Sequence, residues 1–221
     1  MRWTLALGLA LAAPLAAAAE SEAPAPAIEI TARYAPSQAP TLSSDERARL
    51  AHGEVVVREM QASDSDGIGM LVMAVVDAPP ERVWQVMADC DAYEEFVPRV
   101  SHARVRDRDG AFHTCELVVD LPMPLGDQIT ETRQQTRRLP DGAYQRLWTL
   151  LPGDWSYHRN DGSWTAHPHG EGAQSLLVNR MDARPKSSVP LWILRAAQVR
   201  QAPETFLAIR KRVVETADPT D

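Results

Sequence analysis

The sequence predicts an α+β fold in which a run of antiparallel strands precedes one long helix. Turn residues divide the region from residue 54 to residue 182 into short segments of strand character. Asp109-Gly110 and Asp141-Gly142 are hairpin signals, because glycine accepts the positive φ that tight turns need. Strands joined by hairpins pair antiparallel. The last long segment, 190–215, carries apolar residues at spacings of three and four, which is typical of a helix with one buried face.

The first expected element is a short helix. Ser43 or Ser44 suits its N-cap, and the helix covers Asp45–Leu50. Two strands, Glu54–Met60 and Ile68–Asp77, follow on either side of a polar loop.

Residues 78–98 predict one short amphipathic helix that breaks into a second. Pro79 and Pro80 suit a helix start, where their missing amide donors would be unpaired in any case, and Pro98 ends the second helix. Apolar side chains recur at helical spacing and would bury one face: Val83, Trp84, Val86, Met87, Cys90, Tyr93, Phe96 and Val97.

Six further strands are expected before the last helix. They are Val100–Arg108, Phe112–Leu121, Gln128–Arg138, Tyr144–Leu151, Ser163–His167 and Gln174–Asp182. The last helix covers Pro190–Glu215, and we expect Pro203 to kink it because proline removes a backbone donor and clashes with the preceding turn. Its apolar stripe contains Trp192, Ala196, Val199, Pro203, Phe206 and Val213.

Four segments together carry a family resemblance. They are the helix pair at 78–98, the strand junction Leu121-Pro122-Met123-Pro124-Leu125-Gly126-Asp127, the late hairpin with Gly162-Ser163-Trp164 and Gly170-Glu171-Gly172, and Val189-Pro190-Leu191-Trp192 at the start of the last helix. In this order the motifs resemble the START-like or SRPBCC superfamily of polyketide cyclases, coenzyme-Q-binding proteins and START lipid carriers. Gln128 stands where many relatives carry Arg. The resemblance implies a helix-grip fold: a curved antiparallel sheet wraps around a long C-terminal helix, with a ligand cavity between them.

The N-terminus has the pattern of a secretory signal peptide over residues 1–19. Arg2 supplies the positive charge, Leu5 to Leu15 an apolar run shorter than the ~18 residues of a membrane span, and Ala17-Ala18-Ala19 a cleavage site. An uncleaved anchor helix is the alternative. We therefore expect a periplasmic protein made of an Ala/Pro-rich linker (20–43), one ligand-binding domain (44–216) and a disordered tail (217–221).

Composition excludes some partners. The chain has 23 basic and 30 acidic residues and a net charge of −7, which disfavours binding to a nucleic-acid backbone. Cys90 and Cys115 allow a disulfide in an oxidising compartment, but their apolar surroundings favour two buried thiols.

No metal, cofactor or catalytic residue is predicted. The sequence has no nucleophile elbow, phosphate loop or dinucleotide fingerprint. His158, His167 and His169 have no acidic partner at metal-ligand spacing and are expected on a solvated hairpin. Three charged strand residues can face either the cavity or solvent, and the sequence leaves both options open: Glu131, Arg133 and Arg146.

Two functions compete. In the first, the protein binds and transports an apolar ligand such as a lipid, quinone or sterol without catalysis, as a monomer and with transient membrane contact. In the second, it is a cyclase or aromatase that acts on an apolar substrate in the same cavity. Export away from cytoplasmic polyketide synthesis favours the carrier.

The candidate residues fall into two groups. Those expected to line the ligand cavity, each of which could equally be core, are Leu117, Val119, Leu121, Trp148, Trp192, Ala196, Val199 and Phe206. Those expected to form a gate at a membrane, or else only a packed loop, are Met123, Leu125, Leu191 and Ile193.

Overall fold

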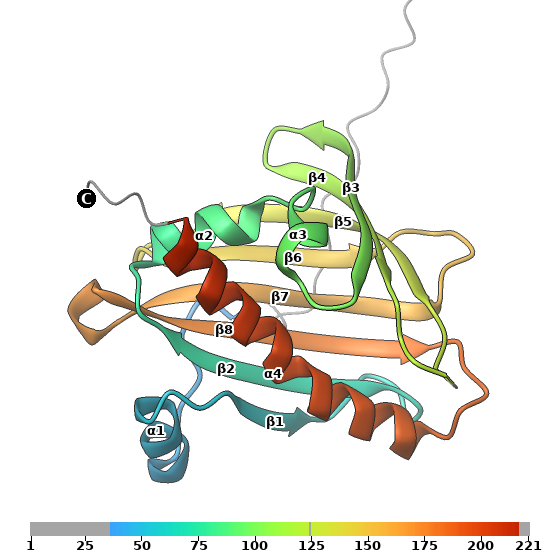
Figure 1. Cartoon of the computed structure of the whole chain (residues 1–221), viewed down its shortest axis with the longest axis horizontal. Helices are drawn as coiled ribbons and strands as arrows, with labels where there is room; N and C mark the ends of the chain where they lie inside the picture. The colour runs from blue at the N-terminus through green and yellow to red at the C-terminus, as the bar shows by residue number, and fades with distance from the viewer. Residues whose placement is uncertain (1–35, 124, 217–221) are drawn as a thin grey trace, which may run out of the picture.

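A computed structural model describes residues 36–123 and 125–216 (Figure 1). The expected signal peptide, the linker up to residue 35, Pro124 and the C-terminal tail lie outside the described residues. The described chain contains the strands β1 (Val56–Met60), β2 (Ile68–Val76), β3 (Val100–Asp109), β4 (Phe112–Val119), β5 (Gln128–Arg138), β6 (Tyr144–Leu150), β7 (Tyr157–His169) and β8 (Gln174–Pro185). Its helices are α1 (Ser44–Ala51), α2 (Pro80–Ala88), α3 (Tyr93–Phe96), the 3-10 turn η1 (Gly170–Gly172) and α4 (Leu191–Glu215).

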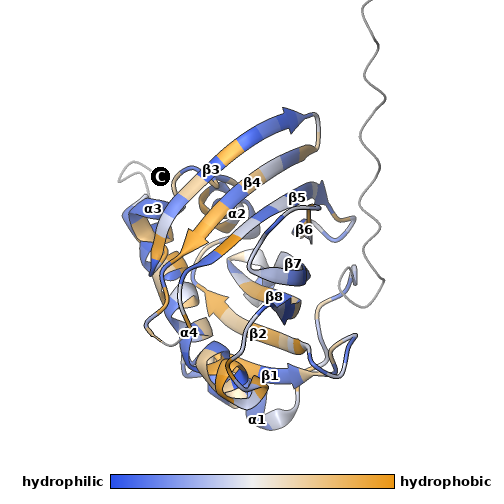
Figure 2. Cartoon of the chain, turned by 90° about the vertical axis from the view of Figure 1, so that its right-hand side faces the viewer, coloured by the Kyte–Doolittle hydropathy of each residue, from blue (hydrophilic) through white to orange (hydrophobic). Residues whose placement is uncertain are grey.

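All eight strands form one antiparallel sheet in the order β1-β2-β8-β7-β6-β5-β4-β3. After β2 the chain crosses through α2 and α3 to the far edge of the sheet, and then meanders strand by strand back to β8. In Figures 1 and 2 the sheet curves, and α4 crosses the strands on its concave side. This last helix continues through Pro203. The α+β class and the helix-grip arrangement are confirmed.

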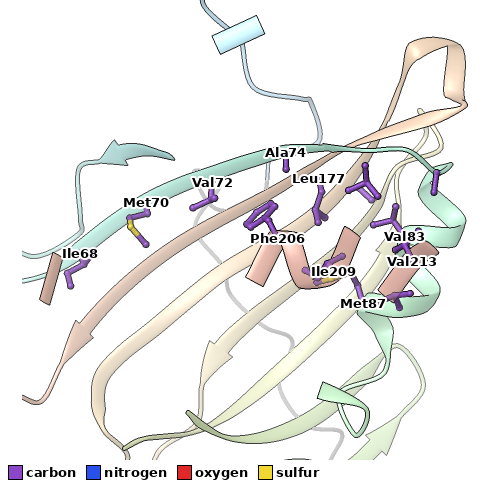
Figure 3. Packing of buried hydrophobic residues seen from close by; sticks show 14 residues of the cluster. Ile68, Met70, Val72, Ala74, Val83, Met87, Leu177, Phe206, Ile209 and Val213 are labelled. Carbon is purple, nitrogen blue, oxygen red and sulfur yellow. The ribbon is translucent and has the colours of Figure 1, made fainter. Parts of the chain in front are cut away.

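The main core lies between β2 and α4. The sequence of β2 is apolar almost throughout, because both of its faces are buried. Alternate residues of β2 face Phe206, Ile209 and Val213 of α4, as Figure 3 shows. The residues between them, Leu71 and Met73, pack on the convex side with Leu50 of α1.

The structure differs from the expected elements mainly in β7. This strand begins at Tyr157 rather than Ser163, because the polar run before Gly162 pairs with β8 along its length. Glycine is needed at position 162, since a Cβ there would overlap with the Trp148 ring and with the backbone oxygen of Arg180.

The last residues of the expected linker pack on the domain. The backbone oxygen of Pro36 accepts a hydrogen bond from Gln145 Nε2 at 3.0 Å, and that of Thr41 accepts one from Arg58 Nη2 at 3.1 Å. Ser43 and Glu46 then form a capping box that starts α1.

Candidate functional site

The concave face of the sheet is covered unevenly. Of the strands, α4 packs against β1 and β2, at one side of the sheet, and it also contacts α2 and α3. On the other side, three hollows lie between the sheet, α3 and the middle of α4.

The inner hollow has a volume of about 210 Å³ and is lined by Tyr93, Cys115, Leu117, Thr130, Thr132, Gln134, Arg146, Trp148, Asn160, Trp164, Asn179 and Met181. The middle hollow, of about 200 Å³, is lined by Met87, Tyr93, Phe96, Val97, Pro98, Val100, Leu117, Val119, Trp164, Thr205 and Ile209. The outer hollow, of about 170 Å³, is lined by Pro98, Arg99, Val119, Leu121, Gln128, Tyr157, Gln198, Gln201, Ala202, Glu204 and Thr205.

The hollows form one row because neighbours share walls. The inner and middle hollows share Tyr93, Leu117 and Trp164. The middle and outer hollows share Pro98, Val119 and Thr205. We call the row the chamber; it runs from β5 and β6 to the surface beside α4.

The outer end of the chamber is polar. Arg99 precedes β3 with φ +66°, a left-handed conformation that is uncommon for a residue other than glycine. Its Nε lies 3.8 Å from the carboxylate of Glu204 on α4, and both side chains line the outer hollow. This pair therefore spans the mouth of the chamber.

The inner end holds a buried cation. Arg146 is 2 % exposed and is the largest fully buried side chain among the described residues. Its guanidinium donates to the backbone oxygen of Met87, to the Tyr93 hydroxyl and, at 3.0 Å, to Gln134 Oε1. It also lies 5.8 Å from the centre of the Trp84 ring and 5.7 Å from that of Tyr93, within cation–π range.

Strand register decides which charged residues face the chamber. Side chains alternate along β5, and Thr130, Thr132 and Gln134 line the inner hollow. The residues between them, Glu131 and Arg133, therefore face the convex side. On the neighbouring strand β6, Arg146 faces the chamber.

A disulfide joins Cys90, after α2, to Cys115 of β4, with 6.4 Å between the Cα atoms. The expectation of two buried thiols is wrong. The register of β4 turns Cys115 to the concave face, directly beneath the turn that carries Cys90, and spacing along the chain does not show this.

Two histidines are buried, one on each side of the sheet. Burial, followed by the positive charge of Arg146, lowers the pKa of His113 to about 4. Burial also lowers the pKa of His167, which lies 3.8 Å from an Asp141 carboxylate oxygen; the expectation that His167 is exposed is wrong. Within 36–123 and 125–216, no three His, Cys, Asp or Glu side chains converge on a possible metal position.

The structure spreads the candidate ligand residues over three environments. Four line the hollows: Leu117, Val119, Leu121 and Trp148. Phe206 is in the core against Trp164, and Val199 packs at the edge of that core. Trp192, 72 % exposed, and Ala196 face solvent.

The rotation of α4 about its own axis explains why Trp192 and Ala196 do not line the hollows. In the first half of α4 the apolar residues that pack on the main core are Leu191, Leu194, Val199 and Ala202. The inward stripe therefore shares Val199 with the predicted stripe and otherwise runs beside it. Trp192 and Ala196 therefore turn away from the sheet.

The candidate gate residues differ from one another in how far they are exposed. Met123 is 86 % exposed, whereas Leu191 and Ile193 are half-buried. Leu125 and Leu194 line the same small hollow, so the β4–β5 loop meets the first half of α4.

Several lining residues were absent from the candidate set: Tyr93, Phe96, Val97 and Trp164. All four belong to the motifs that carry the resemblance, and their apolar pattern was the available signal. That pattern alone is equally typical of core packing.

The profile of one protein family, described as "Polyketide cyclase / dehydrase and lipid transport", matches residues 76–208. The chain belongs to this family. The match spans the helix pair, β3 to β8 and most of α4, and the family is part of the START-like superfamily. Its description joins cyclase or dehydrase chemistry with lipid transport, and both involve hydrophobic ligands.

Solved structures share the fold at low identity. A STAR-related lipid transfer protein from Xanthomonas axonopodis is 19 % identical with a TM-score of 0.64, covering 72 % of this chain and 93 % of that one. Human StAR-related lipid transfer protein 5 is 13 % identical with a TM-score of 0.63, covering 75 % and 84 %. The Zhui aromatase/cyclase from a Streptomyces species is 15 % identical with a TM-score of 0.58, covering 69 % and 97 %.

No curated protein sequence matches the chain. Among the described helices, none is long and apolar enough to cross a membrane.

Proposed function

We propose that the protein binds and transports a hydrophobic ligand in the chamber without transforming it. The observation that carries this proposal is the lining of the inner and middle hollows, which contains no Asp, Glu or His among the described residues. A general acid or base must reach its substrate by a hydrogen bond, and such groups are most often His or a carboxyl. An apolar ligand gains ~25 cal/mol per Å² of buried surface without any chemistry.

The family and two of the similar structures support carriage. The family description names lipid transport, and the Xanthomonas and human proteins are named as lipid transfer proteins.

The test fills the chamber. Leu117→Trp and Val119→Trp place bulk in the shared walls, whereas Ala196→Trp places the same bulk on the solvent side of α4 and serves as the matched control. Each folded variant is expressed with export to the periplasm, and its organic extract is analysed by mass spectrometry. We expect the wild type and the control to retain an apolar molecule that both chamber variants lose. Retention in folded chamber variants, or none in the wild type, would contradict carriage.

The second candidate is a cyclase or aromatase. It has one specific support, the Tyr93 hydroxyl, which lines the inner hollow and accepts a hydrogen bond from Arg146. In that role the hydroxyl would transfer the proton. If purified protein cyclises a poly-β-keto mimic and Tyr93→Phe abolishes the turnover, the enzyme replaces the carrier.

We further propose that the ligand enters where the β4–β5 loop meets α4, on contact with a membrane. Met123 and Trp192 supply exposed apolar surface, and Trp is a common side chain at the membrane boundary. Met123→Asp and Trp192→Asp should weaken liposome flotation and slow ligand transfer. Leu207→Asp, at an exposed apolar position further along α4, is the control and should change neither. Unchanged flotation and transfer in all three variants would refute the gate.

We also propose export to the periplasm with cleavage after Ala19. The Cys90–Cys115 disulfide supports this, because structural disulfides form mainly in oxidising compartments. The mature N-terminal sequence and the cell fraction that contains the protein test it; a cytoplasmic protein that retains Met1 would refute it.

A further inference from the structure

We infer that the chamber selects acidic amphiphiles, in which an anionic oxygen group meets Arg146 and a single apolar body fills the inner and middle hollows. The inference rests on the proposed function and narrows it to a class of ligand.

Arg146 carries a charge that the described residues leave without a counterion. No carboxylate among them lies within 4.0 Å of its guanidinium, and its three hydrogen-bond acceptors are all neutral. Two half-buried arginines of the same chain are paired, Arg159 with Asp182 at 2.9 Å and Arg58 with Glu46 at 2.7 Å. Arg180, which is also buried, has no carboxylate partner among the described residues, but it does not line the inner hollow. A buried charge is costly unless it is paired, and arginine stays protonated in proteins.

The guanidinium is directed to the chamber and retains free donors. It has five N–H groups, and its three hydrogen bonds within the described residues use three of them. Arg146 lines the inner hollow together with Thr130 and Asn179, whose side chains can donate to an oxyanion. Thr132 also lines this hollow, but its hydroxyl donates to the backbone oxygen of Cys115. His113 is neutral near pH 7 because its pKa is about 4, so it adds no second positive charge.

The size of the hollows limits the rest of the ligand. Ligand pockets usually start near ~300 Å³, and the inner hollow of about 210 Å³ reaches that size only with the adjoining middle hollow of about 200 Å³. The middle hollow is lined by Phe96, Val97 and other apolar side chains. One acyl chain or one compact ring system suits this space, with its anionic end at Arg146.

The competing explanation is that Arg146 only ties α2 and α3 to the sheet through Met87 and Tyr93. Both explanations predict that the loss of Arg146 harms the protein. They differ in selectivity, because a structural tie does not distinguish an acid from an alcohol of the same length.

The experiment measures that selectivity on delipidated full-length protein at pH 7. The probes are palmitate, hexadecyl phosphate and hexadecanol, and calorimetry gives each Kd. We expect at least one anion to bind about tenfold to hundredfold tighter than the alcohol, as for a charge-assisted hydrogen bond. Arg146→Gln should abolish this preference and Arg146→Lys should keep part of it. Arg133→Gln, on the convex face, should leave it unchanged.

The outcomes separate the two proposals. If all three probes bind equally to the wild type, the acidic-ligand inference is overturned and carriage stands. If none binds, carriage fails and the inference fails with it. If Arg146→Gln does not fold, the wild-type protein alone still tests the inference. The ratio of its Kd for hexadecanol to its Kd for the anions then shows whether the chamber prefers an acidic ligand. A preference that persists in folded Arg146→Gln also overturns the inference.

Discussion

The two halves of the concave sheet face are built differently. On the β2 side, apolar side chains of the strand interlock with Phe206, Ile209 and Val213 of α4. On the β4–β6 side, threonines, Gln134 and Arg146 of the sheet line the inner hollow instead of packing against α4. Figure 2 shows the same contrast, since β2 is largely hydrophobic in colour and β5 is mostly pale or hydrophilic.

What holds each half together also differs. The β2 side relies on a large apolar cluster. The chamber side has a small cluster around Val100 and Ala103, together with the Cys90–Cys115 bond and the contacts of Arg146. The contrast indicates that α4 stabilises the fold with one half of the sheet, which leaves the other half free for a ligand.

The largest effect is expected when one apolar residue in each half of the sheet is truncated and the losses of stability are compared. Phe206→Ala should lower the free energy of unfolding by about 3–5 kcal/mol, because it removes a fully buried ring from the main core and leaves a cavity. Leu117→Ala, which only enlarges an existing hollow, should cost about 1–2 kcal/mol. Urea unfolding of both variants gives the two values. Equal losses would show that the chamber side is packed as tightly as the core.

Removing the disulfide should come next in size. The bond spans 25 residues, and Cys90→Ser with Cys115→Ser should lower stability by about 3 kcal/mol. Hydrogen exchange should accelerate in α3, β3 and β4 and change little in β2 and β8, because only the chamber side depends on the bond. Uniform acceleration across the sheet would contradict the division into halves.

Acid should weaken the protein through His113. Its pKa of about 4 in the folded state lies below the usual 6.5, so the unfolded chain takes up the proton first as the pH falls. Stability is therefore lost between about pH 6.5 and pH 4, by at most about 3 kcal/mol from this residue.

His113→Gln should flatten that part of the pH dependence, measured by urea unfolding at a series of pH values. The exposed His52→Gln is the control and should leave the profile unchanged. An unchanged slope in His113→Gln would show that the histidine is not the cause.

The smallest effect on stability is expected at the mouth of the chamber. Arg99 and Glu204 are substantially exposed, so Glu204→Gln should change the free energy of unfolding by less than about 1 kcal/mol. If the pair restricts the mouth, stopped-flow measurements should show faster exchange of palmitate in this variant. Glu215→Gln, at the end of α4, is the matched control and should leave the exchange rate unchanged. A slower or unchanged rate in Glu204→Gln would remove the pair from the entry route.

Patterns along the chain predicted most of the fold. Residues 78–98 predicted the helix pair, the Asp-Gly turns predicted antiparallel hairpins, and the apolar stripe predicted α4. The polar strand start at 158–161 was not predicted, because its strand character comes from pairing with β8. Local propensity does not contain that information.

The candidate site was predictable only in part. Leu117, Val119, Leu121 and Trp148 alternate along strands, so their face followed once the strands were placed. On α4, successive residues are rotated by about 100° around the helix axis, so a shift of one residue moves a side chain from the inward stripe to the solvent side. Apolar residues occur on both sides of this helix, and Trp192 is one that faces solvent.

The sequence by itself determined the order of the elements, the family and an apolar interior. Only the tertiary structure decided which half of the sheet α4 covers, that Cys90 meets Cys115, and that Arg146 faces the chamber while Arg133 does not. The physical reason is that helical and strand periodicities are local properties of the chain. Register between strands and the crossing of a helix over a sheet depend on residues that are distant in sequence.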